Sequence, residues 1–304
     1  MGKVKKIKGG AYDMFVSEDG KLVTTHNIRN GVYVYDIETA KPVLSVKTVS
    51  NVSLSVVSPD KKILAAKNTS GHLALISMET GEEICRNKMS DHEGYMMTFT
   101  EDSKYVIDFD WQGRTMLLDT ENNFKILDDI IPGEYSYPPY AYLHYDRYSR
   151  SIYKLVDRGR GFKTAVAMIS PADKDNISYN VIKEFKGAAP SHLKGISFCK
   201  EHIYYLDLNN RQIVVADKEF NEVNRIKMPF KGDEIYNHFG QMWVSPCEKY
   251  VYFYLYGSMS GLFDLESMKL IKEFGYFNVT DFKMVNEDTR FIISTWYESY
   301  IEEI

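Results

Sequence analysis

The chain has 304 residues, of which 44% are apolar and 26% charged, values ordinary for a soluble globular protein of one large domain or two smaller ones. Its 37 lysines and arginines against 42 aspartates and glutamates give a net charge of −5, which argues against general nucleic-acid binding because neutralising phosphates needs a basic surface. No apolar run approaches the roughly 18 residues of a membrane-spanning helix, so no membrane association is expected. Aromatic residues make up 14% of the chain, which favours strands.

The N-terminus and the cysteines bear on the cellular compartment. MGKVKKIKGG is basic but has no apolar run behind it, so it lacks the pattern of a secretory signal, and Lys6 stands where a myristoylation signal needs Ser or Thr. Cys85, Cys199 and Cys247 lie far apart without a CxxC pair, which predicts free thiols in a reducing compartment. These features predict a cytoplasmic protein.

A short pattern of an apolar residue, a polar turn ending in Lys or Arg, and a second apolar run recurs along the chain. The clear copies are VSEDGKLVTT from Val16, VVSPDKKILAA from Val56, FTEDSKYVID from Phe99, VSPCEKYVYF from Val244 and VNEDTRFIIS from Val285. Val16, Val57 and Phe99 are spaced by 41 and 42 residues, and Val244 and Val285 by 41. Degraded copies begin at Tyr145 and Phe198, so we count seven copies.

A second pattern, a β-rich run followed by a polar turn and another apolar run, accompanies many of these copies. It reads GVYVYDIETAKPVLSV from Gly31, GHLALISMETGEEICR from Gly71, GRTMLLDTENNFKILD from Gly113, RQIVVADKEFNEVNRI from Arg211 and SGLFDLESMKLIKEF from Ser260. Each unit therefore holds four strand-length runs, which we label a to d in chain order. No stretch keeps a helical period over three turns, which argues against HEAT or armadillo repeats. A period of about 42 residues with four strands is typical of a β-propeller blade, because only stacked blades cover both faces of such a sheet.

The repeats predict an all-β fold: a single seven-bladed β-propeller domain over residues 1–304, with four-stranded antiparallel blades. The blades are expected at about 12–50, 51–92, 93–138, 139–192, 193–238, 239–279 and 280–304. The last unit has only three strands, FKMV (282–285), RFIISTW (290–296) and SYIEEI (299–304), while KVKKIK (3–8) is a spare extended segment. We therefore expect the N-terminal strand to join the C-terminal blade and close the ring, the alternative being a disordered basic tail.

At these residues the chain resembles WD-repeat and YVTN-type β-propellers over essentially its whole length. The turn Ser58–Asp60 matches the a–b turn of such repeats, and VYVYDIETAK (32–41) and GLFDLESMK (261–269) match strand c and the turn after it. The closing Trp-Asp pair of the strict WD repeat is replaced by Tyr35-Asp36, Leu118-Asp119 and Phe263-Asp264. The Gly-His pair before strand a is also missing, although its loops hold single histidines, His92, His192 and His238. The resemblance implies a propeller; most WD-type members are scaffolds for protein or peptide partners, whereas other propellers are enzymes.

The usual signatures of catalysis and of cofactor binding are missing. The chain contains no GxSxG, HExxH, EF-hand loop, P-loop or GxGxxG. DRGRGFK (157–163) has the composition of a phosphate loop, but as one short loop between strands it is better explained as a β-turn with solvated charges. The neighbouring acids Asp128-Asp129 and Glu302-Glu303 point to opposite strand faces or lie in turns, which is poor geometry for acid–base catalysis. We expect no catalytic residue, no metal site and no cofactor.

The d–a and b–c loops share one face of a propeller, around the channel mouth, and here they are rich in Tyr, Trp, Arg and His. The residues predicted to bind a partner are His26, Arg29, Trp111, Arg114, Tyr135, Tyr137, Arg158, Arg160, His192, Tyr236, His238, Tyr256, Trp296 and Tyr297. Tyr, Trp and Arg are enriched at binding hot spots, and PGEYSYPPYAY (132–142) adds prolines that stiffen an aromatic loop. The competing explanation is that these aromatics pack between blades.

The sequence thus predicts a non-enzymatic scaffold whose loop face binds a protein or peptide segment, an acidic one in view of the arginines. The alternative is a propeller enzyme or small-molecule sensor with a pocket at the channel mouth, acting on a sugar-like or lactone-like compound. A closed pocket with several converging carboxylates or histidines would favour that alternative. A large apolar patch on the rim would instead indicate a structural subunit of a larger complex.

Overall fold

The structure is a computed structural model that describes residues 4–11, 14–27, 31–110, 115–122, 126–129, 142–146, 148, 151–156, 165–169, 179–185, 195–231, 239–256, 260–285 and 289–304. This part of the chain consists of strands and turns, without an α-helix. It accordingly includes no helix of the length and apolarity needed to cross a membrane.

The strands within these ranges pair into seven antiparallel sheets; in six of them the strands follow one another along the chain, and the seventh combines the first strand with the last three. The first three sheets contain β2 (Leu22–Asn27), β3 (Gly31–Asp36) and β4 (Pro42–Val46); β5 (Val52–Val57), β6 (Ile63–Asn68), β7 (His72–Ser77) and β8 (Glu83–Lys88); and β9 (Gly94–Phe99), β10 (Tyr105–Asp110), β11 (Thr115–Asp119) and β12 (Ile126–Asp129). The fourth and fifth contain β13 (Tyr142–Asp146), β14 (Ser151–Val156), β15 (Ala165–Ile169) and β16 (Tyr179–Glu184); and β17 (Ile196–Phe198), β18 (Ile203–Asp207), β19 (Gln212–Ala216) and β20 (Glu222–Lys227). The sixth contains β21 (Phe239–Val244), β22 (Tyr250–Leu255), β23 (Ser260–Asp264) and β24 (Leu270–Glu273), and the seventh β25 (Val279–Val285), β26 (Arg290–Thr295), β27 (Glu298–Glu303) and β1 (Lys5–Lys8).

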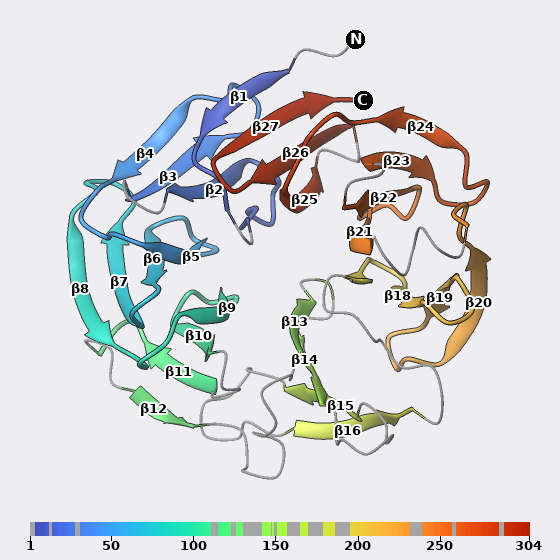
Figure 1. Ribbon diagram of the computed structural model, residues 1–304. Helices are drawn as coiled ribbons and strands as arrows, with labels where there is room; N and C mark the ends of the chain where they lie inside the picture. Colours follow the sequence, from blue (N-terminus) through green and yellow to red (C-terminus); the bar gives the residue numbers. More distant parts are fainter. Residues whose placement is uncertain are drawn as a thin grey trace.

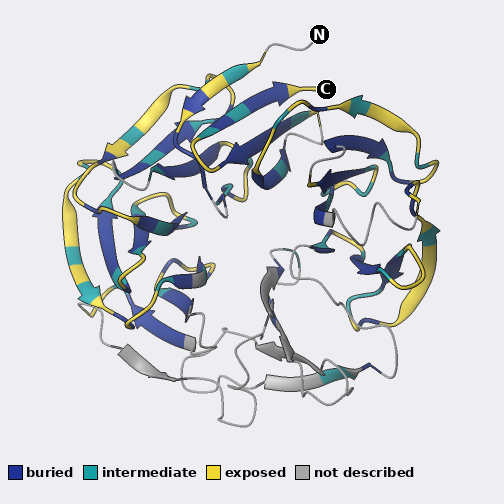
Figure 2. Cartoon of the chain, viewed as in Figure 1, coloured by how far each residue is buried: buried dark blue, intermediate teal, exposed yellow. Residues whose placement is uncertain are grey.

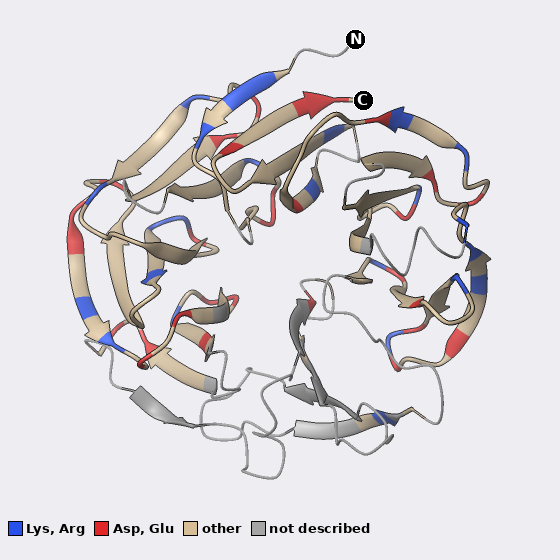
Figure 3. Ribbon diagram, in the orientation of Figure 1, with Lys and Arg blue, Asp and Glu red and all other residues tan. Residues whose placement is uncertain are grey.

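The sheets stand side by side around a common centre (Figure 1). The first strand of a sheet, such as β5 or β21, lies nearest the centre, and the last, such as β8 or β24, lies at the rim. Figure 2 shows that the middle strands are buried while the rim strands are largely exposed. Many of the Lys, Arg, Asp and Glu residues lie in the rim strands and in the turns (Figure 3).

The middle strands of the second sheet are buried because this sheet packs its two faces against the first and the third sheet. In β6, Leu64 and Ala66 belong to a core cluster that includes Val34 of the first sheet, whereas Ala65 packs in a cluster with Val106 of the third sheet. Alternate residues of a strand point to opposite faces, so this strand supplies two cores at once. This explains why its apolar residues run continuously instead of alternating with polar ones.

The repeated sequence pattern forms one kind of a–b turn, closed by its own side chains. The Ser58 hydroxyl donates to Asp60 Oδ1 at 2.6 Å and accepts the backbone N–H of Ile63 at 3.0 Å. Ser17 and Thr100 close the corresponding turns of the first and third sheets. The positive-φ position of the turn is occupied by Gly20, Lys61, Ser103 and Glu248 (φ 67°, 60°, 63° and 59°). The repetition therefore encodes turn geometry.

The two ends of the described chain meet in the seventh sheet. β1 pairs antiparallel with β27, from Lys5 opposite Ile301 to Lys8 opposite Glu298. The segment after β1 is held by side chains of the same sheet: Ser299 Oγ donates to the Gly9 carbonyl at 3.0 Å, and the Ala11 N–H donates to Ser294 Oγ at 2.7 Å.

The innermost part of the first sheet is less regular than the sequence predicts. Four strands are expected in this unit, whereas the described residues give three, β2 to β4, and isolated bridges of Gly10 with His26 and Val16 with Val23; residues 12–13 lie outside the described part. The physical reason is that the amide of Ala11 and that of Met14 donate to side chains of the seventh sheet, the latter to Asp281 Oδ2 at 2.7 Å. Those donors are not available to a ladder with β2.

Candidate functional site

Four of the predicted partner-binding residues lie in the described part of the chain: His26, Tyr256, Trp296 and Tyr297. The others, Arg29, Trp111, Arg114, Tyr135, Tyr137, Arg158, Arg160, His192, Tyr236 and His238, lie outside the described residues. His26 is buried, because the segment of Gly9 and Gly10 runs across the end of β2 and the His26 N–H donates to the Gly10 carbonyl at 2.9 Å. Its side chain therefore adds little to the surface.

Three of the four, Tyr256, Trp296 and Tyr297, are exposed by 47%, 49% and 77%. The structure adds Phe277, the most exposed large apolar residue of the described part at 82%, which sequence reasoning missed. We call these four residues the aromatic quartet. Phe277 lies in a d–a loop, one of the two kinds of loop predicted to form the binding face. The adjacent aromatic pair Tyr276-Phe277 is the sequence feature that indicates it.

Strand register places the quartet at one end of the sixth and seventh sheets. Val279 pairs with Thr295, so Phe277 just before β25 and Trp296 just after β26 lie beyond the same end of that hairpin. In the sixth sheet Phe239 pairs with Leu255, so Tyr256 follows at the equivalent end. The quartet thus comes from the b–c turns of two neighbouring sheets and the d–a loop between them.

Packing beneath the quartet joins the two sheets. The Asn278 N–H donates to the Tyr254 hydroxyl at 2.9 Å, and the Tyr254 and Tyr256 rings meet edge to face with centroids 5.0 Å apart. On the other side the backbone of Gly10 touches the Trp296 turn so closely that a Cβ there would lie 1.9 Å from the Thr295 carbonyl oxygen. The rings therefore project from loops whose backbones are held in place.

Charged groups beside the quartet are paired with one another. Glu298, which follows Tyr297, forms an ion pair with Lys6 and accepts the Tyr300 hydroxyl. These hydrogen bonds hold the pKa of the Glu298 carboxyl below its usual value. Glu302 accepts Lys272 Nζ at 3.0 Å together with the Tyr276 hydroxyl, whose pKa is raised by burial and by this carboxylate.

A cavity of about 690 Å³ runs along the centre of the molecule between the innermost strands. Half-buried side chains on its wall are Phe15, Met96, Phe198, Trp243 and Lys283. Behind Trp243, the Tyr252 ring stacks on Phe282 with centroids 4.1 Å apart. Lys283 Nζ lies 3.1 Å from Asp281, whose carboxylate also accepts the Met14 N–H.

The described residues do not assemble a catalytic constellation around this cavity. Within the ranges given above, no group of three or more His, Cys, Asp or Glu side chains could hold a metal ion. Glu302 and Glu303 occupy successive positions of β27 and pair separately with Lys272 and Arg290, in agreement with the expectation that neighbouring acids face opposite ways. The described lining of the cavity is mostly apolar, and its charged side chains include the ion pair of Lys283 with Asp281.

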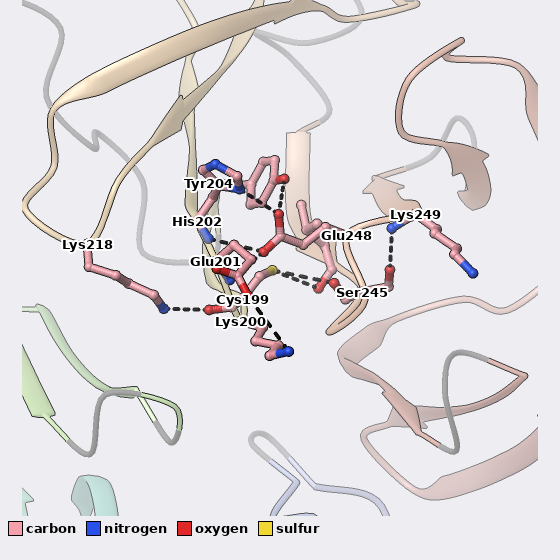
Figure 4. A network of polar contacts seen from close by, with 10 residues as sticks. Cys199, Lys200, Glu201, His202, Tyr204, Lys218, Ser245, Glu248 and Lys249 are labelled. Carbon is pink, nitrogen blue, oxygen red and sulfur yellow. Dashed lines mark hydrogen bonds and ion pairs between the residues drawn. The ribbon is translucent and has the colours of Figure 1, made fainter.

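The opposite end of the molecule, formed by a–b turns, carries a polar network (Figure 4). Glu248 of the sixth sheet accepts the N–H groups of Glu201 and His202 at 2.8 and 3.1 Å. It also contacts His202 Nδ1 at 2.7 Å and the Tyr204 hydroxyl at 2.8 Å. All of these partners belong to the fifth sheet, so Glu248 joins two neighbouring sheets.

The network extends through Cys199 and Lys218. Cys199 Sγ lies 3.4 Å from the Ser245 carbonyl oxygen of the sixth sheet. Lys218 Nζ donates to the Cys199 carbonyl at 2.5 Å and to Asp146 of the fourth sheet at 2.8 Å. Every polar group described here is engaged with a neighbouring turn, which gives the network a structural role.

Replacing Glu248 with Gln is expected to lower the free energy of unfolding by about 1.5–3 kcal/mol at pH 7, because charge-assisted hydrogen bonds are lost. Burial alone would raise the pKa of Glu248, but hydrogen bonds from His202 and Tyr204 outweigh it and hold the pKa below the usual 4.5. A carboxyl whose pKa is depressed by folding stabilises the protein above its unfolded-state pKa, and this contribution disappears as the pH falls through the folded value.

The difference in urea midpoint between wild type and Glu248→Gln should therefore stay nearly constant from pH 7 down to the unfolded-state pKa of 4.5 and shrink as the pH falls further. Glu18→Gln, at an exposed turn position, is the matched control and should differ little from wild type at any pH. A difference between wild type and Glu248→Gln that stays constant as the pH falls below 4.5 would contradict the account.

Comparisons with known proteins support the architecture. No family model matches the chain, and no curated protein matches it. The β-propeller domain of Myceliophteria thermophila Cps50 (Swd1) superposes with a TM-score of 0.72 and 10% identity, covering 99% of this chain and 100% of that domain. Kuenenia stuttgartiensis hydrazine synthase superposes with a TM-score of 0.69 and 14% identity, covering 95% and 93% of the two chains. Identities this low show the fold alone, and that fold is a β-propeller.

Proposed function

We propose that this protein is a non-enzymatic scaffold that binds a protein or peptide through the face formed by its b–c and d–a loops. The aromatic quartet is the observation that carries the proposal. Exposed Tyr and Trp rings on a fixed backbone offer large contact areas at little entropic cost, which is why they dominate binding hot spots. The ten predicted residues outside the described ranges belong to the same proposed face.

The distribution of exposed apolar residues supports this choice of face. Within the described ranges, the other large exposed apolar side chains are aliphatic and lie on rim strands or near the chain ends. They are Val4, Val43, Ile84, Val223, Leu270, Ile271 and Ile304. The exposed aromatic rings, by contrast, come from adjoining loops of the sixth and seventh sheets.

We further propose that the seven sheets are the seven blades of one ring, with boundaries near those expected from the repeats, and that β1 closes it. The pairing of Lys5–Lys8 with β27 and the side-chain bonds to Gly9 and Ala11 support closure. We place the protein in the cytoplasm, in view of its cysteine usage, with a protein rather than a nucleic acid as partner, in view of its charge of −5.

The double variant Trp296→Ala/Tyr297→Ala tests the proposed face. Affinity capture from native lysate, quantified by mass spectrometry, should recover a set of proteins with wild type and with the control Ile84→Ala, whose side chain is exposed on the rim strand β8. The double variant should lose these proteins by about tenfold or more, because both rings are hot-spot types. Its melting temperature should stay close to that of wild type, since the rings are largely exposed.

A second candidate function, a small-molecule sensor or enzyme, is favoured by the central cavity of about 690 Å³, a size that suits a small ligand. The same capture experiment separates the two. Unchanged recovery with Trp296→Ala/Tyr297→Ala would contradict binding through the quartet. Recovery lost only on substitution of Trp243, on the cavity wall, would move the protein-binding site to the mouth of the channel.

A further inference from the structure

Among the residues that the structure describes, the charged groups beside the aromatic quartet balance one another. Lys6 is paired with Glu298, and Lys272 with Glu302. Two further exposed charges nearby have opposite signs: Lys8, opposite Glu298 in the strand pairing, and Glu273, at the start of the loop that leads to Phe277. A strongly acidic or basic segment would gain little net attraction here and would compete with existing ion pairs.

The exposed rings of the quartet come from separate loops. Phe277 and Tyr297 are the most exposed of them, at 82% and 77%, and they project from two different loops at the same hairpin end. Tyr256 leans on Tyr254, beside the loop that carries Phe277. Aromatic side chains are the groups against which prolyl rings pack where proline-rich segments are recognised.

From this balance of charge and exposure of rings, we infer that the aromatic quartet binds an uncharged, proline-rich peptide segment in an extended polyproline II conformation. Such a segment is already ordered before binding, so it loses little conformational entropy. Its affinity comes from contact between prolyl and aromatic rings. This inference rests on the proposed function and names the chemistry of the partner.

A random peptide library displayed on phage tests the inference. Selection is carried out on the full-length wild-type protein, with counter-selection on Phe277→Ala/Tyr297→Ala. The control Leu270→Ala, exposed on the rim strand β24, should retain the same peptides as wild type. Circular dichroism and melting temperature establish that each variant is folded. The enriched peptides should be rich in proline and poor in charged residues.

Affinity measurements on an enriched peptide sharpen the test. Fluorescence polarisation should show a loss of about tenfold or more in Phe277→Ala/Tyr297→Ala, as expected for removal of hot-spot rings. The affinity should change by less than about twofold between low and high salt, because the contact is not ionic.

Each outcome of the selection decides between the proposals. Enrichment of acidic or basic peptides that still require the quartet would overturn the inference and leave the proposed function standing. Peptides that bind the quartet variant equally well, or no enrichment at all, would overturn both.

Discussion

Replacing Asp108 with Ala is expected to lower the free energy of unfolding by about 3–5 kcal/mol, because it leaves a buried ammonium group without its counter-charge. Lys67 Nζ of the second sheet lies 2.6 Å from Asp108 Oδ2 of the third, and both side chains are 0% exposed. Urea unfolding followed by circular dichroism would measure the loss as a shift in midpoint at unchanged slope.

The double variant Lys67→Met/Asp108→Leu is the informative partner experiment. Removing both charges together also removes the desolvation cost, so stability should return close to that of wild type or above it. Gly94 lies against this pair, where an added Cβ would meet Lys67 Cδ at 3.0 Å and Leu54 Cδ1 at 2.6 Å, so the space for new side chains is limited. A cost below about 1 kcal/mol for Asp108→Ala would show that Lys67 finds another partner or reaches water.

Replacing Ile7 with Asp is expected to lower the free energy of unfolding by about 4 kcal/mol or more, because a charge would enter the core between the first and seventh sheets. Ile7 is 3% exposed and belongs to a cluster with Val23, Tyr35, Ile292 and Ile301, which come from both of these sheets. Urea unfolding monitored by intrinsic fluorescence would measure the effect.

Val4→Asp is the matched control for Ile7→Asp. Val4 lies just before the same strand but is 50% exposed, so the same substitution there should cost little. Equal stability of the two variants would mean that β1 does not hold the ring together, and would contradict its proposed role in closure.

The predicted functional face shows where sequence reasoning works and where it stops. Position in a b–c loop predicted Tyr256, Trp296 and Tyr297 as surface residues, and all three follow the ends of middle strands and are exposed. Loop class alone could not separate them from His26, which occupies an equivalent b–c position but is covered by the crossing segment of Gly9 and Gly10. The sequence does not single out Phe277, because Phe274, Tyr276 and Phe277 are aromatic residues of the same loop. In the structure Phe274 is buried and Tyr276 half-buried, whereas Phe277 is exposed, so only the packing distinguishes the three.

Contacts between sheets lay beyond sequence reasoning for a related reason. Lys67 and Asp108 stand one repeat apart, as do Glu248 and its fifth-sheet partners, but no spacing rule says which polar residues of neighbouring repeats will face each other. Only the stacking of the sheets brings these groups within hydrogen-bonding distance. Burial then makes the pairing obligatory, because an isolated buried charge is too costly to tolerate.

The sequence by itself determined the all-β architecture, the repeat and the turn geometry, because these depend on residues close together in the chain. Ser58, Asp60 and Lys61 make a turn from their own hydroxyl, carboxylate and backbone angles, whatever lies around them. The tertiary structure alone decided which loop aromatics reach solvent, which charges pair across sheets and what supports the aromatic quartet. Those outcomes depend on how neighbouring sheets cover one another, and that packing joins residues that local sequence does not connect.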